Sequence, residues 1–249
     1  MKEMLEYKFN INGFDVCATY TRKSIEEIFQ PLLRMLTKLQ RDKDRRILVY
    51  LAAPPAVGKS TLAQTLEMLS KQDDSLCEIQ AIGLDGFHYP QAYIASHSII
   101  KNGKEISMKD VKGCPETFDI DKITTAIQAM RTRNIKWPIY DRNLHDVVED
   151  QIKISANIIL IEGNWLLLQD DKWKDLTSYC DFRIFVKANK DMLKKRLIDR
   201  KIKGGLSYTE ALAFYEKSDG QNVERVLTNS QKADMVLNLS NDHDFEEER

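Results

Sequence analysis

The sequence predicts an α/β fold of three layers, with helices on both faces of a mostly parallel sheet. Apolar runs that suit strands alternate with segments of helical periodicity along most of the chain. The runs at 46–52 and 156–161 are almost continuously apolar, as expected of parallel strands buried on both faces. The first run leads through a short turn-forming stretch to Gly58-Lys59-Ser60-Thr61 and then to a helical pattern. That order of strand, loop and helix is what a phosphate-binding loop requires.

Residues 1–45 are expected to form an extension that packs on this core. Tyr7–Ile11 and Phe14–Ala18 alternate in polarity around Asn12-Gly13, a strong signal for a two-residue hairpin turn. Ser24-Ile25-Glu26-Glu27 has the pattern of a capping box, and apolar residues follow it at helical spacing. The extension is therefore predicted to be a β-hairpin followed by a capped helix. A homodimer contact through the hairpin is a role that the sequence leaves open.

The core domain is expected to span 46–240, and an acidic tail at 241–249 is expected to be frayed from Asp242 onward. Residues 86–118 are interpreted as irregular apart from a short helix near 90–98, and 142–155 as a polar excursion. The predicted strands lie at 46–52, 79–84, 137–140, 156–161, 182–186 and 233–239, and the predicted helices at about 59–71, 119–132, 172–179, 190–203, 207–218 and 220–230.

Composition argues against several classes of protein. The 249 residues carry 37 Lys and Arg against 38 Asp and Glu, so no overall basic charge favours nucleic-acid binding. No apolar run approaches the roughly 18–20 residues of a membrane span, and the charged N-terminus lacks the apolar core of a signal peptide. The four cysteines are scattered and form no Cys-x-x-Cys pair. We therefore expect a cytoplasmic protein with neither a nucleic-acid nor a membrane partner.

The loop after the first core strand predicts a nucleoside triphosphate site. Its backbone N–H groups would surround the phosphates, the Lys59 ammonium would reach the outer phosphates, and the Ser60 hydroxyl would meet Mg²⁺. Such loops usually open with glycine; here Ala53 stands in that place, and its Cβ favours a negative φ. The alternative is a turn that merely starts a helix. The predicted phosphate contacts are Ala56, Val57, Gly58, Lys59, Ser60 and Thr61.

Two further predicted strands end in a carboxylate, Asp85 after 79–84 and Glu162 after 156–161. Ligands of open parallel sheets bind beyond the carboxyl ends of the strands, so both side chains are expected near the phosphates. Phosphoryl transfer needs a group that orients or deprotonates the accepting hydroxyl, and Mg²⁺ beside the outer phosphates. Asp85 is interpreted as the catalytic base and Glu162 as a metal ligand together with Ser60. The alternative for each carboxylate is that it caps a helix or a loop.

Tyr140, Arg142 and His145 come at the end of the strand at 137–140 and would suit recognition of a polyhydroxylated acceptor. His88 and Asn164, each within three residues of a strand-end carboxylate, are further candidates for contact with the acceptor. The alternatives are a surface histidine, an arginine paired with a neighbouring aspartate, and side chains that only pack their loops.

Arg196 and Arg200 lie four residues apart on a predicted helix, so they share one face of it. The helix ends at Gly204-Gly205, and we interpret about 194–207 as a mobile lid. The two arginines would then stabilise charge on the transferred phosphoryl group. The alternative is a basic face that is simply solvated.

Taken in order, these motifs resemble those of the P-loop small-molecule kinases of the uridine kinase, phosphoribulokinase and bacterial pantothenate kinase type. Within this group the likeness is closest to bacterial proteins described as fructose-transport-system or nucleoside/nucleotide kinases. The matching stretches are Ala53–Thr61, Leu84–His88, Lys112–Asp119, Tyr140–Asp146, Glu162–Leu166, Arg200–Ser207 and Ser218–Val223.

The resemblance implies a P-loop NTPase fold that binds ATP with Mg²⁺ and a small-molecule acceptor. It implies a general base at Asp85 and a Mg²⁺-associated acid at Glu162. It also implies acceptor contacts in the Tyr-Asp-x-x-x-His stretch, which fall on Tyr140, Arg142 and His145, and lid arginines at Arg196 and Arg200.

We therefore expect an ATP-dependent kinase whose acceptor is a small polyhydroxylated metabolite, with a sugar such as fructose as the first choice. A nucleoside or a pantothenate-like alcohol is the alternative acceptor. Uridine kinases usually carry Phe and Arg where this chain has Arg142 and Asp146, which argues against a nucleoside. A nucleotide-binding regulatory switch, or an ATPase that phosphorylates no metabolite, is the alternative from another class.

Overall fold

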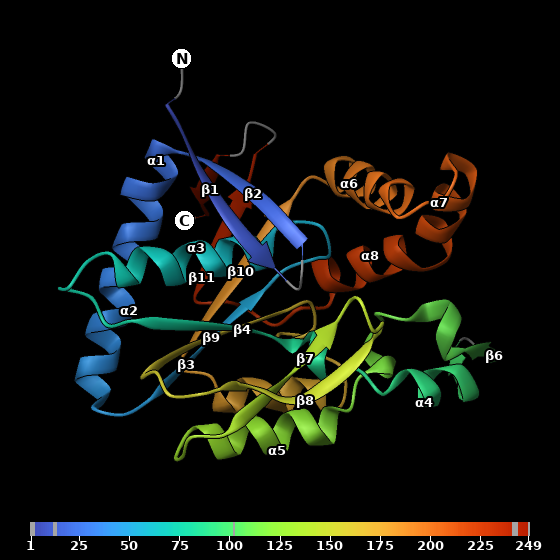
Figure 1. Ribbon diagram of the computed structural model, residues 1–249, viewed down its shortest axis with the longest axis horizontal. Coiled ribbons are helices and arrows are strands. Elements are labelled where there is room, and N and C mark those ends of the chain that lie inside the picture. Colours follow the sequence, from blue (N-terminus) through green and yellow to red (C-terminus); the bar gives the residue numbers. More distant parts are fainter. Residues whose placement is uncertain (1–2, 12–13, 102, 241–243, 249) are drawn as a thin grey trace.

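A six-stranded sheet forms the middle layer of the computed structural model, which describes residues 3–11, 14–101, 103–240 and 244–248 (Figure 1). The strands follow the order β12-β11-β10-β3-β9-β4, and every neighbouring pair is parallel except β11 with β12. The predicted α/β fold with a mostly parallel sheet is confirmed. The strands are β3 (Ile47–Ala52), β4 (Ile79–Gly83), β9 (Ile158–Gly163), β10 (Phe182–Ala188), β11 (Met235–Leu239) and β12 (Phe245–Glu247).

Helices cover both faces of this sheet, because side chains alternate along each strand. In β3, Val49 and Leu51 pack in one apolar cluster with α2 and α3, whereas Leu48 and Tyr50 pack in another with α5. No helix of the described residues is both long enough and apolar enough to cross a bilayer. The helices are α1 (Arg22–Ser24), α2 (Gln30–Lys43), α3 (Lys59–Lys71), α4 (Gln91–Ser96), α5 (Ile120–Met130), α6 (Lys190–Lys203), α7 (Tyr208–Phe214) and α8 (Gly220–Thr228), with π-helical turns at Ile25–Phe29 and Tyr215–Asp219.

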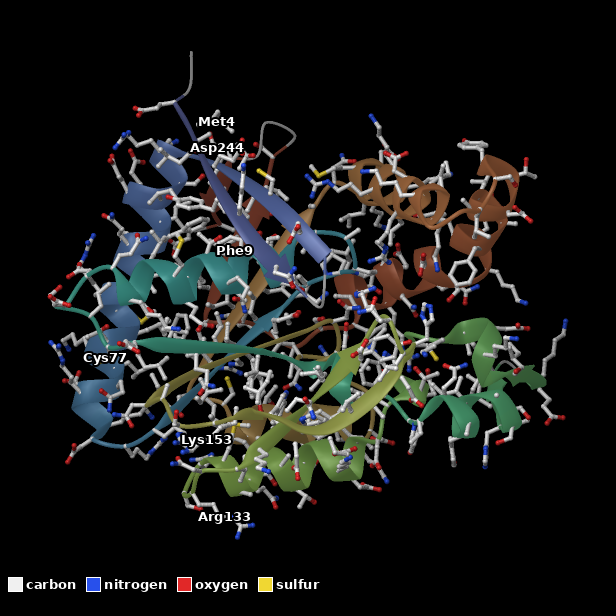
Figure 2. The ribbon with its side chains drawn as sticks, viewed as in Figure 1. Met4, Phe9, Cys77, Arg133, Lys153 and Asp244 are labelled. Atoms are coloured by element: carbon white, nitrogen blue, oxygen red, sulfur yellow. The ribbon has the colours of Figure 1, made fainter. Side chains whose placement is uncertain are left out.

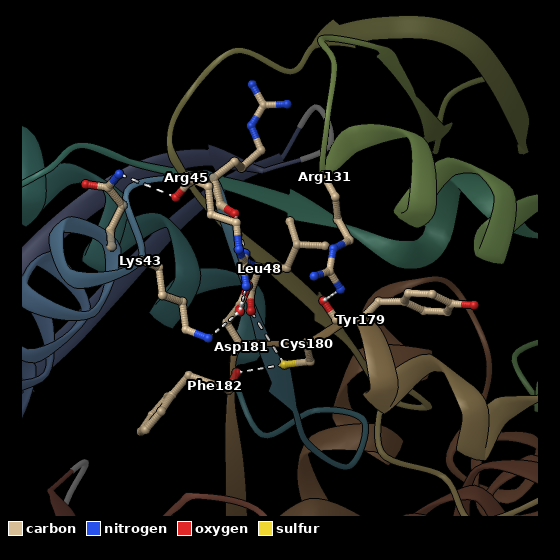
Figure 3. Close-up of polar contacts among 10 residues, drawn as sticks. Lys43, Arg45, Leu48, Arg131, Tyr179, Cys180, Asp181 and Phe182 are labelled. Carbon is tan, nitrogen blue, oxygen red and sulfur yellow. Dashed lines mark hydrogen bonds and ion pairs between the residues drawn. The ribbon is translucent and has the colours of Figure 1, made fainter.

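Asp181 ties β3 to β10 at the end of the sheet opposite the phosphate loop. Its side chain is only 4% exposed, and its carboxylate accepts hydrogen bonds from the Arg45 guanidinium at 2.6 Å and the Leu48 N–H at 3.0 Å (Figure 3). The Lys43 ammonium lies 3.1 Å away. Burial opposes ionisation of this carboxyl, but its hydrogen bonds outweigh burial and lower the pKa of Asp181. The carboxylate therefore stays charged and keeps the two strands together.

The N-terminal extension packs on the sheet as a hairpin and a helix. β1 (Met4–Ile11) pairs antiparallel with β2 (Phe14–Thr21), and the predicted turn at Asn12-Gly13 lies outside the described residues. The Tyr20 ring lies 5.2 Å from the Phe29 ring, centroid to centroid, so the hairpin and the following helix share an apolar contact.

The start of that helix differs from the predicted capping box. The N-cap is Thr21, whose Oγ1 accepts the N–H of Ser24 at 3.1 Å. Ser24 is itself buried, donates to the Asp244 carboxylate at 2.9 Å and accepts the Phe245 N–H at 2.9 Å. Figure 2 shows Asp244 beside the hairpin, close to Met4. The placement of the N-cap at Ser24 is therefore wrong, because contacts with the distant C-terminal segment engage its hydroxyl.

The expectation of a frayed C-terminal tail is wrong for residues 245–247. These residues form β12, which pairs antiparallel with β11. Phe245 is only 4% exposed, and its ring lies 5.3 Å from the Phe29 ring. Burial of the Phe245 side chain thus holds residues 245–247 on the sheet, although the charges of this segment favour solvent.

Two small hairpins lie in segments where the sequence showed no paired strands. β7 (Lys136–Asp141) pairs with β8 (Asp146–Lys153), and β5 (Ser98–Lys101) pairs with β6 (Lys104–Ser107). The interpretations of 142–155 as a polar excursion and of 86–118 as irregular apart from one helix are corrected accordingly. Because no residue of β6 or β8 is buried, these strands lack the apolar runs that reveal buried strands.

Gly86 lets the β7–β8 hairpin dock at the end of β4. A Cβ at position 86 would lie 2.3 Å from the Pro138 carbonyl oxygen, and the buried Trp137 indole donates to the Gly83 carbonyl at 2.8 Å. Gly86→Ala is therefore expected to lower the free energy of unfolding by about 1–3 kcal/mol, because backbone must shift to admit the methyl group. Urea denaturation would measure this loss. Gly204→Ala, whose Cβ would meet nothing nearer than 3.3 Å, is the control, and equal losses in both variants would contradict the explanation.

Candidate active site

The phosphate-binding loop joins β3 to α3 and contains two residues in the left-handed region. Gly58 has φ 98° and Ala56 has φ 66°, whereas Ala53 has a negative φ, as predicted. Left-handed residues among right-handed ones form the kind of backbone nest that binds anions. The Cβ of Ala56 makes its conformation costly by roughly 1–2 kcal/mol. A hydrogen bond from the Thr61 hydroxyl to the Gly58 carbonyl at 2.6 Å helps to hold the loop.

Glu162, at the end of β9, lies directly beside this loop because β9 is the neighbour of β3. The Ser60 hydroxyl donates to Glu162 Oε1 at 2.8 Å, and the Lys59 Nζ lies 3.7 Å from Oε2. Glu162 is only 9% exposed. Burial, together with the negative charge of Asp85, raises the pKa of Glu162 above 4.5, although Lys59 and Ser60 act in the opposite direction.

Asp85 follows β4, the strand next to β9 in the sheet. It lines a cavity of about 100 Å³ together with Ser60, Glu162 and Tyr140. In the part of the chain that the structure describes, no hydrogen bond or ion pair joins the Asp85 carboxylate to another group. Three neighbouring strands thus bring the phosphate loop and both candidate carboxylates to one cavity, and the Asp85 carboxylate is free to meet a ligand there.

Lys112, for which the sequence predicted no role, contacts Tyr140, a residue that lines this cavity. Its ammonium donates to the Tyr140 hydroxyl at 2.8 Å and to Gln91 Oε1 at 2.7 Å, and it lies 4.6 Å from the centre of the Tyr140 ring. Among the described residues no carboxylate lies within 4.0 Å of this ammonium. The motif Lys-Gly-Cys-Pro-Glu that begins at Lys112 was the available signal. The structure therefore adds a positive charge without an ionic partner beside Tyr140.

His88 packs on the same side of the site as Tyr140. Its ring stacks on Phe118 with centroids 3.8 Å apart, lies 6.0 Å from the Tyr140 ring and contacts the Thr117 carbonyl through Nδ1 at 3.2 Å. Its position near Asp85 agrees with the predicted neighbourhood, but packing occupies much of the ring.

The remaining candidates lie in three regions: the β7–β8 turn, the segment after β9, and α6. Arg142 and His145 lie exposed in the turn between β7 and β8, and Arg200 lies exposed on α6; none of the three lines a described cavity at the loop. Asn164 follows β9, and its Oδ1 is buried with no hydrogen-bond partner among the described residues, which marks it as an acceptor that lacks a donor. Arg196 donates to the Ala56 and Val57 carbonyls at 3.4 and 3.3 Å.

The pair of Ser60 and Glu162 offers oxygen donors of the kind that Mg²⁺ prefers. The described residues hold no group of three or more His, Cys, Asp or Glu side chains placed to share a metal ion. Mg²⁺ usually binds through one or two carboxylates together with substrate phosphates and water, so a site with few protein ligands beside a phosphate loop fits this ion.

Burial of His88 predicts a pH dependence of stability. Burial lowers the pKa of His88 below 6.5, although Asp85 and the Thr117 carbonyl act in the opposite direction. The unfolded chain therefore takes up a proton at a higher pH than the folded chain, and stability is lost as the pH falls from 6.5 through the folded pKa. Denaturation over a series of pH values should show this decline, and His88→Gln should remove it. The exposed His97, changed to Gln, is the control; an unchanged slope in His88→Gln would contradict the prediction.

Comparison with known proteins finds a matching family model, relatives in sequence and similar solved structures. A family model described as "Phosphoribulokinase / Uridine kinase family" matches residues 48–246. The chain is 42% identical to "Uncharacterized protein YggC" of Escherichia coli (strain K12), over 95% of this chain and 96% of that protein. It is 27% identical to a pantothenate kinase of Enterococcus faecalis (strain ATCC 700802 / V583), over 72% of this chain and 62% of that protein. Among solved structures it is similar to a "putative fructose transport system kinase" from Silicibacter sp. TM1040, with a TM-score of 0.71 and 26% identity over 82% of this chain and 98% of that one.

Proposed function

The chain belongs to the phosphoribulokinase / uridine kinase family and is a small-molecule kinase, and we propose that it transfers the γ-phosphoryl group of ATP to a hydroxyl of a small polyhydroxylated metabolite, with a sugar such as fructose as the first choice. The observation that carries this proposal is the meeting of Ser60, Glu162 and Asp85 at one cavity beyond neighbouring parallel strands. Phosphate binding, a metal ligand and a free base are the three parts that the transfer needs.

On the nucleotide side, Lys59 and the N–H groups of residues 56–61 hold the outer phosphates. Ser60 and Glu162 hold Mg²⁺, directly or through water. When bound, this ion neutralises charge on the phosphates and helps to orient them. The 2.8 Å contact between the two side chains supports this assignment, because it keeps both oxygens beside the loop.

On the acceptor side, Asp85 takes the proton of the attacking hydroxyl. The hydroxyl oxygen then bonds to the γ-phosphorus as the bond from that phosphorus to the β–γ bridging oxygen breaks, and ADP leaves. Arg200 would neutralise charge as the phosphoryl group passes; Arg196, predicted for the same role, donates to the Ala56 and Val57 carbonyls of the loop. Arg200 is exposed on α6, so in this role it needs the proposed lid at 194–207 to close.

The acceptor would contact Tyr140 at the cavity, His88 next to Tyr140, and Asn164 beyond β9. Arg142 and His145 would reach it from the exposed β7–β8 turn. If either of these two side chains orients the acceptor, its replacement by alanine should raise the acceptor KM and leave ATP binding nearly unchanged.

Lys112 favours a second candidate, an acceptor that carries a carboxylate or a phosphate as well as its hydroxyl. A half-buried ammonium whose described partners, Tyr140 and Gln91, are both neutral is suited to an anionic ligand. A pantothenate-like alcohol has this chemistry, and a relative of the chain is named as a pantothenate kinase.

A coupled assay of ADP release tests the proposal with the purified protein, ATP and Mg²⁺, over a panel of neutral sugars, nucleosides, pantothenate and phosphorylated sugars. The expected result is acceptor-dependent ADP release with one class of acceptor. ATP hydrolysis that no acceptor stimulates would contradict metabolite phosphorylation and support the alternative of a switch or an ATPase.

Lys112→Gln separates the two acceptor classes in the same assay. Loss of a charge-assisted hydrogen bond is expected to raise the KM of an anionic acceptor by roughly 10- to 100-fold. The KM of a neutral sugar should change far less. Lys109→Gln, on an exposed neighbour in the same segment, is the matched control. Equal effects on neutral and anionic acceptors would exclude the anion-binding role of Lys112.

A further inference from the structure

A second cavity, of about 360 Å³, lies on the other side of the phosphate loop from Asp85. The first cavity lies toward β9 and β4 on one side of β3, whereas this one lies toward β11 and β12 on the other. Its walls come from the loop, α3, α6 and the C-terminal strands, through Val57, Gly58, Thr61, Arg196, Leu239 and Phe245.

The remaining wall is the segment 16–20 of β2, which lines the cavity with five consecutive residues. Successive side chains of a strand point to opposite faces, so a cavity lined by consecutive residues runs along the edge of the strand. β1 occupies one edge of β2, and no strand of the described residues pairs with the other edge. Peptide N–H and C=O groups on that edge are therefore available to a ligand.

The position of this cavity suits the nucleoside part of a nucleotide. A triphosphate whose γ-phosphate meets Asp85 extends across the loop, and its nucleoside must then lie on the far side. The volume of about 360 Å³ falls within the roughly 300–1,000 Å³ of small-ligand pockets.

The Arg196 side chain can bind the aromatic base of a nucleotide. Its guanidinium is half-buried, makes only the long hydrogen bonds to the loop carbonyls described above, and has no carboxylate within 4.0 Å among the described residues. A guanidinium without an ionic partner at the wall of a largely apolar cavity can stack on a flat aromatic ring.

We propose that the N-terminal hairpin is part of the nucleotide site, with residues 16–20 of β2 and Arg196 enclosing the base and ribose of the donor. The inference rests on the proposed function in that it takes a nucleotide as the donor. The hairpin precedes the residues matched by the family model, so it adds a wall that the shared part of the chain does not supply. Hydrogen bonds of Thr21 and Ser24 to Asp244 join the hairpin to the segment that carries Phe245, so the two walls are held together.

Hydrogen exchange of the full-length wild-type protein tests this inference, with ADP and inorganic triphosphate as probes. ADP is expected to slow exchange of amides in residues 16–20 by roughly tenfold or more, whereas inorganic triphosphate, which fills only the loop, should leave them unchanged. The β6 segment serves as an internal reference. Calorimetry in parallel reports whether each probe binds. ADP binding with unchanged exchange in β2 would overturn the hairpin's role alone, whereas failure of ADP to bind would overturn the proposed function as well.

Val16→Trp provides a second test, because the larger ring would occupy the cavity. The variant should bind ADP at least about tenfold more weakly and inorganic triphosphate with nearly unchanged affinity. Lys8→Trp adds the same ring to β1 of the same hairpin, at a position that does not line this cavity, and should bind both probes normally. Equal weakening of both probes by Val16→Trp, or no weakening of ADP, would overturn the inference.

Discussion

Asp85→Asn is expected to lower kcat by about 10²- to 10⁴-fold, the usual contribution of a general base. The amide cannot take the proton of the acceptor hydroxyl but keeps the size of the carboxylate. Because no described group depends on the Asp85 carboxylate for a hydrogen bond or ion pair, the fold and the loop should stay intact. The coupled ADP assay measures kcat, and calorimetry should show ATP affinity close to that of the wild type.

Glu162→Gln is the matched comparison, since both carboxylates line the same cavity. Its main effect should be a higher Mg²⁺ requirement, because Glu162 is the proposed metal ligand, whereas Asp85→Asn should keep the wild-type Mg²⁺ requirement. A protein that only binds nucleotide as a switch would be indifferent to Asp85→Asn, and wild-type turnover in that variant would refute the role of the base.

Lys59→Ala is expected to lower kcat/KM for ATP by at least about 10²- to 10³-fold, because a positive charge aimed at the outer phosphates is lost. The Lys59 side chain is 15% exposed and lies 3.7 Å from Glu162, so it is already held at the loop. Steady-state kinetics over a range of ATP concentrations would measure the loss. Lys71→Ala, at the far end of the same helix, is the control, and unchanged kinetics in Lys59→Ala would refute the assignment of the loop.

The same variant should alter the pH dependence of activity. The pKa of Glu162 is raised by burial and by Asp85, and Lys59 counteracts this rise. Without the lysine the pKa of Glu162 rises further, and because Mg²⁺ binds the carboxylate form, the acid limb of the pH–rate profile should move to higher pH. The raised pKa also means that the contribution of Glu162 to stability is full below pH 4.5 and is lost as the pH rises through the folded pKa. Above that pH the ionised, buried carboxylate of Glu162 therefore opposes folding.

Sequence patterns were sufficient where the interactions are local or strongly apolar. The buried strands at 47–52 and 158–163, the loop before α3 and the hairpin of β1 and β2 follow from periodicity and turn residues a few positions apart. The same reasoning failed at β8 and at the N-cap of the first helix. β8 has no buried residue and carries no apolar run, and the hydroxyl of Ser24 donates to a residue 220 positions away.

The linear chain supplied the residue types on which the proposed chemistry depends, because a phosphate-loop pattern and two carboxylates stand at the ends of predicted strands. The chain did not show which of these residues would come together in space. Strand order places β9 between β3 and β4 and so brings Ser60 to Glu162 across 102 residues of sequence. Packing outside the central sheet brings Lys112 to Tyr140 and the hairpin to the cavity beside the loop. These adjacencies come from the burial of apolar faces and from hydrogen bonds between distant segments, and no local pattern encodes which distant surfaces meet.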